Sequence, residues 1–252
     1  MKMMVDLLKQ HNPPLYYFGL LCLLGAGLCP ALTQLTHAPV AGANAWYKPF
    51  KFLLSTMVFV WSMAWYMQHL DHPAAIRWYS WGVIVLLGIE NVYISLQAAR
   101  GQLSHFNLTT PFYASMWSLM AGAAVAVSIW TAYIGVLFFQ KLPGLSPPYL
   151  WGIRMGILLF VLFSMEGLAM GARLAHTVGG PDGSPGLPVV NWSRQHGDLR
   201  IAHFLGMHAL QVIPLVAYYG LGSVTGVIGF SAFYGLSSLW LFVQALQGKP
   251  FF

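Results

Sequence analysis

Apolar residues form seven long stretches in this chain, and a short polar segment separates each stretch from the next. A helix needs about 20 mostly apolar residues to cross a bilayer, and each of these stretches reaches that length. Proline stands at or just before the start of several stretches, where its missing N–H is tolerated. The pattern predicts transmembrane helices near residues 15–35, 50–70, 76–99, 111–140, 149–175, 200–219 and 224–246.

The composition supports the same class of protein. Hydrophobic residues make up 58% of the chain and charged residues only 7%, whereas a soluble domain carries about 25% charged residues. So few charges cannot cover a water-exposed globule, and most of the outer surface is therefore expected to face lipid. No polar stretch is long enough for a second domain. We expect an all-α, polytopic integral membrane protein whose residues 1–252 form one helical bundle.

The charge pattern limits the partners and the topology. The formal net charge is +6, but the basic residues are scattered over short loops, which is typical of headgroup contact and argues against a nucleic-acid partner. An odd number of spanning helices places the two termini on opposite sides of the membrane. The basic residues are divided too evenly between the two sides to set the orientation, which stays open.

The longer polar loops gather at one end of the predicted bundle, the end at which the helix near 76–99 leaves the membrane; we call it face B. Loops that a rigid scaffold holds on one side often carry function. Lys48 and Lys51 flank a proline there, at the start of a helix, where two cations and a helix N-terminus suit an anionic group. Interfacial anchoring of the two lysines is the alternative.

Two carboxylates and one imidazole are expected at a single depth inside the bundle. Glu90 and Glu166 each lie about nine residues from the face-B end of their helices, and His208 lies about eight residues from Arg200, where its helix begins. All three are then roughly 12–14 Å beneath face B. An acid in the hydrocarbon region is costly and indicates function. The three side chains are therefore predicted to meet in one buried site.

Other residues extend this site toward face B. Tyr93 and Gln97 share the helix face of Glu90, because they follow it by three and seven residues. His203 and His105 are candidate ligands or proton carriers. Arg100 and Arg200 lie at the membrane boundary and are expected to pair with acids or to bind an anionic group. The residues in this prediction with catalytic roles are Glu90, Glu166, His105, Arg100 and Arg200; those with cofactor-binding roles are His203, His208, Lys48 and Lys51.

Three functions fit these features. The first is a membrane metalloprotein, an oxidoreductase or hydrolase acting on a lipid-soluble or amphipathic small molecule. Its metal ligands would be Glu90, Glu166, His208 and His203, which suit non-haem iron, manganese or zinc, and a histidine axial ligand would suit haem b. The second is a proton-coupled transporter in which the two acids titrate. The third is a cofactor-free accessory subunit of a larger membrane complex, with a membrane-protein partner or a second copy of the chain.

Overall fold

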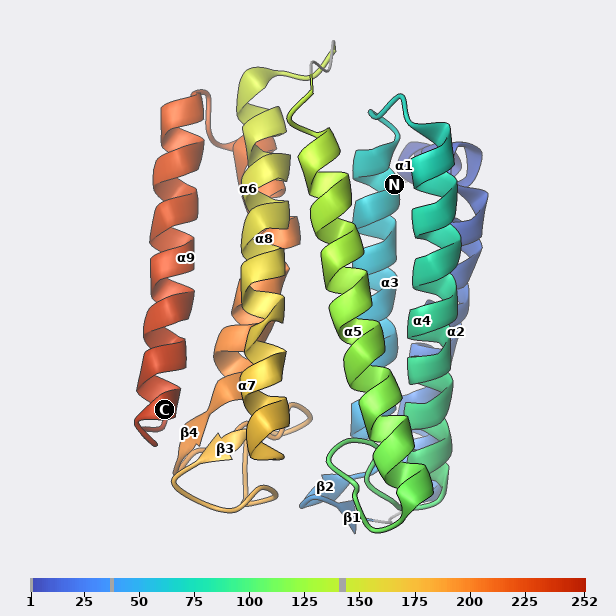
Figure 1. The fold of residues 1–252 in the computed structure, drawn as a ribbon, viewed down its shortest axis with the longest axis vertical. Helices are drawn as coiled ribbons and strands as arrows, with labels where there is room; N and C mark the ends of the chain where they lie inside the picture. The colour runs from blue at the N-terminus through green and yellow to red at the C-terminus, as the bar shows by residue number, and fades with distance from the viewer. Residues whose placement is uncertain (1, 37–38, 141–143) are drawn as a thin grey trace. The chain divides into compact units, whose positions relative to one another are not determined.

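The computed structural model describes residues 2–36, 39–140 and 144–252, which are almost entirely helical (Figure 1). Among the described residues, seven spans are long and apolar enough to cross a membrane. This confirms the all-α polytopic class. The helices are α1 (Lys2–His11), α2 (Pro13–Leu35), α3 (Tyr47–Met67), α4 (Pro73–Ala99), α5 (Pro111–Leu137), α6 (Pro147–Ser164), α7 (Glu166–Arg173), α8 (Leu199–Tyr219) and α9 (Val224–Leu246).

Three features of the described residues were missing from the sequence prediction. The span predicted near 149–175 is interrupted at Met165, where α6 ends and α7 begins. The segment before the first span is a separate helix, α1. Two small antiparallel hairpins also occur, one formed by β1 (Pro39–Val40) and β2 (Ala43–Asn44) and the other by β3 (Thr177–Val178) and β4 (Gly197–Asp198).

The helices belong to two compact units. Unit 1 comprises Met1–Val127 and Gly183–Asn191, and unit 2 comprises Ser128–Asp182 and Trp192–Phe252. The long helix α5 therefore contributes its first part to unit 1 and its last part to unit 2. The single bundle expected from the sequence stays a prediction.

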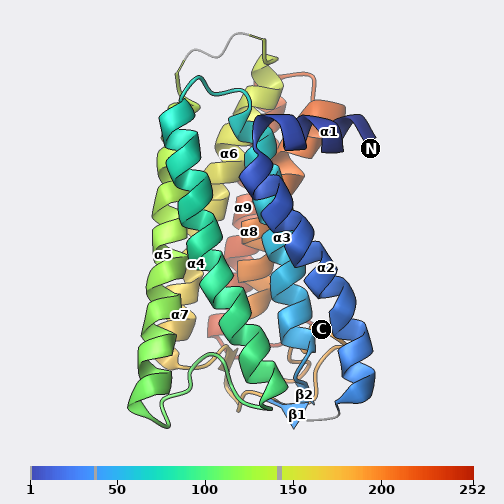
Figure 2. The ribbon, with the colours of Figure 1, turned by 90° about the vertical axis from the view of Figure 1, so that its right-hand side faces the viewer.

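In unit 1, α3 packs against both α2 and α4. Gly19 on α2 is needed for this contact because a Cβ there would collide with the indole of Trp61, whose Nε1 donates to the Tyr16 carbonyl at 3.2 Å. The chain turns sharply between α1 and α2, so that α1 lies crosswise at the start of α2 (Figure 2). Asn12 fixes this corner, since its Oδ1 caps α2 and its Nδ2 donates to Ser80 Oγ on α4 at 2.9 Å.

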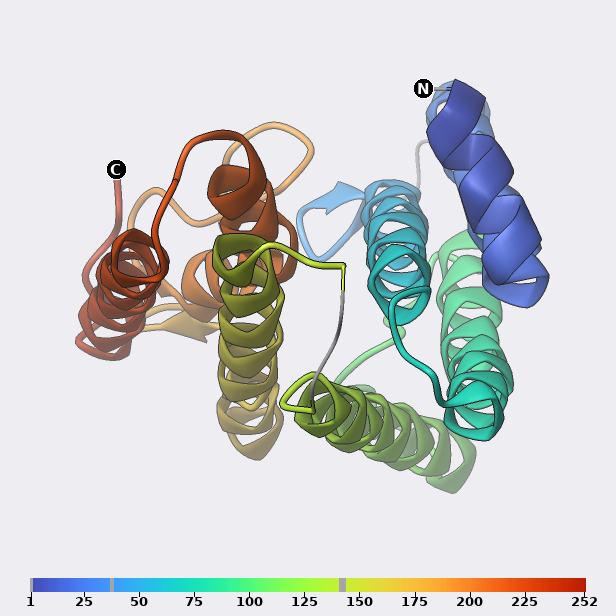
Figure 3. The ribbon, with the colours of Figure 1, turned by 90° about the horizontal axis from the view of Figure 1, so that it is seen from above.

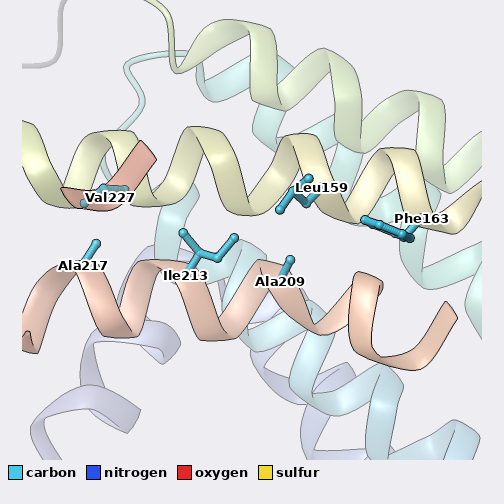
Figure 4. Packing of buried hydrophobic residues seen from close by; sticks show 6 residues of the cluster. All are labelled: Leu159, Phe163, Ala209, Ile213, Ala217 and Val227. Carbon is cyan, nitrogen blue, oxygen red and sulfur yellow. The ribbon is translucent and has the colours of Figure 1, made fainter. Parts of the chain in front are cut away.

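In unit 2, α6, α8 and α9 lie side by side (Figure 3). Their contact is an apolar cluster formed by Leu159, Phe163, Ala209, Ile213, Ala217 and Val227 (Figure 4). Gly152 and Gly156, one turn apart on α6, allow the backbones of α6 and α8 to approach closely, as small residues do in membrane helix pairs. A Cβ on Gly156 would lie 3.0 Å from the Ala209 carbonyl oxygen and 3.1 Å from Cδ of Pro214.

An acid outside the spans holds the loop that follows α7. The Asp182 carboxylate lies 2.9 Å from Nδ1 of His176, within ion-pair distance, and accepts from the backbone amides of His176 and Thr177 at 3.2 and 2.8 Å. Burial on its own would raise the pKa of Asp182. The hydrogen bond and charge of His176, with the bonds from Thr177, outweigh that effect and hold the pKa well below its usual range.

We expect Gly156→Leu to lower the free energy of unfolding by about 1–3 kcal/mol, because the added side chain would meet the backbone of α8 in a filled interface. Chemical denaturation in detergent, followed by circular dichroism, measures this. Gly229→Leu on α9 is the matched control, since a Cβ at Gly229 would meet nothing within 4 Å. Equal stabilities for the two variants would contradict the packing described for α6 and α8.

We expect Asp182→Asn to speed hydrogen exchange at the His176 and Thr177 amides about five- to tenfold at neutral pH, because a net hydrogen bond contributes about 1 kcal/mol. The folded-state pKa of Asp182 lies below its unfolded value, so this stability is present above the unfolded pKa and is lost as the pH falls toward the folded one. Asp71→Asn, at an exposed position, is the control. Unchanged exchange in Asp182→Asn would contradict the role of the carboxylate.

Candidate functional site

A buried acid and a histidine form the centre of the candidate site in unit 1. Glu90 on α4 is 8% exposed, and its Oε1 lies 3.7 Å from Nε2 of His105. His105 belongs to the loop between α4 and α5, which folds back so that the ring reaches the acid. At this distance the two groups attract one another when the histidine is protonated, and a small movement converts the contact into a hydrogen bond.

The loop backbone is bent to present His105. Phe106, the next residue, has φ +58°, in the left-handed region that a bulky side chain rarely adopts. Such a conformation costs on the order of 1–3 kcal/mol and persists only where the surroundings impose it. The ring of Trp117 contacts both side chains, with centroid distances of 5.4 Å to His105 and 4.9 Å to Phe106. Phe52 lies edge-on to the imidazole at 5.5 Å.

Hydrogen bonds within the loop fix this bend. Gln97, at the end of α4, and Asn107 both donate from their side-chain amides to the carbonyl of Leu103, at 3.1 and 3.2 Å. Ser104 Oγ lies 3.2 Å from Nδ1 of His105. Because Ser104 and Asn107 are buried, the loop is an ordered part of unit 1, and His105 is held in place from both sides.

The two lysines at the start of α3 have different surroundings. Lys48 lies close enough to Glu90 to interact with it electrostatically, and its Nζ is 5.7 Å from the ring centroid of Phe52. Lys51 Nζ donates to the Val190 carbonyl at 3.0 Å and so secures the 183–191 segment of unit 1. Lys48 is therefore the lysine that accompanies the buried acid, and the anion site predicted for both residues stays a prediction.

The other predicted acid lies at the helix break in unit 2. Glu166 is the first residue of α7 and is 8% exposed, and its Oε2 has no hydrogen-bond partner within the described parts of the chain. Next to the break, the carbonyl of Phe163 accepts from Nδ1 of His203 at 2.9 Å. Because a carbonyl only accepts, His203 carries its proton on Nδ1 and presents a lone pair on Nε2.

His208 is held in a similar way on α8. Its Nδ1 lies 3.1 Å from Oε1 of Gln211, an acceptor, so this histidine also leaves Nε2 as the unprotonated nitrogen. The ring packs edge-on against Phe204, with centroids 4.3 Å apart. His203 and His208 are five residues apart and therefore point to different sides of the helix.

Of the two predicted arginines, Arg200 has an acidic partner. Its guanidinium binds both carboxylate oxygens of Asp198, at 2.9 and 2.6 Å, and its backbone amide donates to the same acid. The Asp198 side chain is fully buried and also accepts from the Ser193 amide at 2.8 Å. This confirms the expected pairing for Arg200. Arg100 is exposed just beyond α4.

The structure brings together only some of the predicted site. Glu90, His105 and Lys48 gather in unit 1, whereas Glu166, His203 and His208 belong to unit 2. Their convergence on one ligand stays a prediction. In residues 2–36, 39–140 and 144–252, no three or more His, Cys, Asp or Glu side chains are grouped so that they could hold a metal ion.

The sequence analysis did not foresee the direct Glu90–His105 contact or the aromatic surroundings of His105. The only signal was the density of polar residues in the segment that contains His105. No protein-family model, curated protein or solved structure matches this chain. The class of this protein therefore comes from the fold itself: it is a polytopic α-helical membrane protein with polar groups buried inside its spans.

We expect Asp198→Ala to lower the free energy of unfolding by about 3–5 kcal/mol, because it removes the partner of a partly buried guanidinium and the cap of α8. Thermal unfolding in detergent measures the loss. Arg194→Gln, at an exposed position nearby in the sequence, is the control and is expected to change stability by no more than ~0.5 kcal/mol. A loss below ~1 kcal/mol for Asp198→Ala would mean that the pair is dispensable.

Proposed function

We propose that this protein is a proton-coupled membrane protein in which Glu90 and His105 take up and release the proton. The observation that carries the proposal is the 3.7 Å approach of His105 to a buried acid in the α4 span. An ionisable side chain inside a membrane span is a functional hypothesis by default, and chains of acids and histidines are typical proton relays in pumps and transporters.

The charges around the pair support this role. A buried carboxylate without a counter-charge would remain protonated, whereas Lys48 and a protonated His105 both stabilise its ionised form. The histidine is only partly buried, so it can exchange protons with the aqueous side. Histidine changes charge near neutral pH, which allows a proton to pass between the two groups under physiological conditions.

A second candidate function has support from unit 2. A histidine whose Nδ1 is fixed by an oxygen acceptor is the usual form of a metal ligand, because Nε2 is then free to bind. His203 and His208 both have this arrangement, and Glu166 supplies an unpartnered buried oxygen. Because the two histidines point to different sides of α8, only one of them at a time would belong to such a metal site, with iron, manganese, zinc or haem b as its cofactor. The visible spectrum and metal content of the purified protein test it.

The environment of the proposed function is the lipid bilayer. An open apolar groove on α9 is lined by Phe233, Leu236, Ser237, Trp240, Leu241 and Phe251. Such a surface suits an acyl chain, which fits an amphipathic or lipid-soluble transported molecule. The same surface suits a membrane-protein partner or a second copy of the chain, so the accessory-subunit hypothesis remains the third possibility.

We expect infrared difference spectra of the protein in lipid to show a protonated carboxyl band from Glu90 that appears and disappears as the pH is varied around neutrality. Glu90→Gln removes this band completely, and His105→Gln shifts the pH at which it appears, because the acid loses its neighbour. Glu166→Gln is the matched control, a second buried acid whose replacement leaves the Glu90 band in place. A Glu90 band that does not respond to pH would contradict proton exchange at this pair.

A further inference from the structure

We infer that Tyr93 and Gln97 form the access path by which protons reach Glu90 from the end of α4, with ordered water joining their oxygen atoms. This inference rests on the proposed function, because it supplies the route for the proton that Glu90 exchanges. Tyr93 relays the proton through its hydroxyl, and Gln97 acts as a positioning residue for water. Neither is required for Glu90 itself to carry a proton.

The three residues lie on one face of α4. Tyr93 follows Glu90 by three residues and Gln97 follows Tyr93 by four, so successive side chains rise by about 4.5 and 6 Å along the helix axis. Two hydrogen bonds of ~2.8 Å through one water molecule span about 5 Å. Spacings of this order between successive positions leave room for ordered water to connect their oxygen atoms.

Each of the two side chains presents a buried oxygen that needs a partner. The Tyr93 hydroxyl has no hydrogen-bond partner among the residues that the structure describes, and Tyr93 is only 8% exposed. Gln97 is fully buried. Its Nε2 donates to the Leu103 carbonyl, which fixes the amide so that Oε1 is the free acceptor, and Oε1 also has no partner in the described ranges. Buried polar atoms in this position ordinarily bind water.

The path opens where α4 ends. Ala99, Arg100 and Gly101 are exposed. Arg100 and Tyr113, from the following helix, lie close enough to the Tyr93 hydroxyl to interact with it electrostatically. The charged and titratable groups along the path are therefore Arg100 and Tyr113 at its outer end and Lys48 and His105 at its inner end. Asn91 also has an unpartnered buried oxygen, but it lies about 100° around the helix from Glu90 and donates to Thr56 on α3.

The transfer along this file balances with one proton taken from the aqueous side. The water molecule near Gln97 takes up that proton and donates one to the Tyr93 oxygen as the hydroxyl passes its own proton to the next water. That water in turn protonates the Glu90 carboxylate. The tyrosine hydroxyl can do this because it is both a donor and an acceptor. The Gln97 amide passes no proton and only holds the first water in place through Oε1.

The test is the rate at which the Glu90 carboxyl exchanges its proton for deuterium, followed by time-resolved infrared spectroscopy after the membrane sample is moved into D₂O. We expect Tyr93→Phe and Gln97→Met each to slow this exchange about tenfold or more, while the pH range over which the Glu90 band appears stays unchanged. Tyr79→Phe is the matched control: it removes a hydroxyl from another buried tyrosine of α4, away from the path, and is expected to exchange at the wild-type rate.

The outcomes separate the path from the proposed function. If the wild-type Glu90 band fails to respond to pH, the proposed function is wrong, whatever the variants do. If the band responds to pH but either Tyr93→Phe or Gln97→Met exchanges at the wild-type rate, the path is wrong and the proposed function stands. The exchange is measured only on variants whose circular dichroism matches the wild type, and the two substitutions provide independent tests.

Discussion

The structure depends on one constraint: a polar group within a lipid-facing span must find its partner inside the protein. The bonds between helices follow from it. Next to the break at Met165, the carbonyl of Phe163 accepts a hydrogen bond from the ring of His203 on α8. Tyr234 on α9 donates to the Leu205 carbonyl of α8 at 2.6 Å. Side chains that satisfy a neighbour's backbone in this way fix the order in which α6, α8 and α9 pack.

The candidate functional groups are the buried polar side chains that do not find a partner for every polar atom. Along one face of α4, an acid, a phenol and an amide are buried together, and two of their oxygens have no protein partner in the part of the chain that the structure describes. In unit 2, Glu166 is in the same situation at a helix break. Most of the other buried side chains are apolar, so these polar groups are candidate sites for water, protons or ions.

Much of the fold could be predicted from the sequence, because apolar length and proline position alone set the ends of spanning helices. The interruption at Met165 could not be predicted, since Ser164 and Met165 carry no helix-breaking signal. The burial of Glu90 was expected from its position inside an apolar stretch. The contact between Glu90 and His105 could not be predicted. It depends on how the loop after α4 folds back, and tertiary contacts determine that.

The left-handed backbone at Phe106 has a consequence for how this protein would respond to selection. Glycine or asparagine would relax the loop there, so selection for thermal stability alone would favour replacing the phenylalanine. The replacement would also remove the ring that packs on Trp117 beside His105. Stability and the placement of the histidine therefore oppose each other at this position, and a stabilised variant obtained without regard to activity is expected to carry its substitution in this loop.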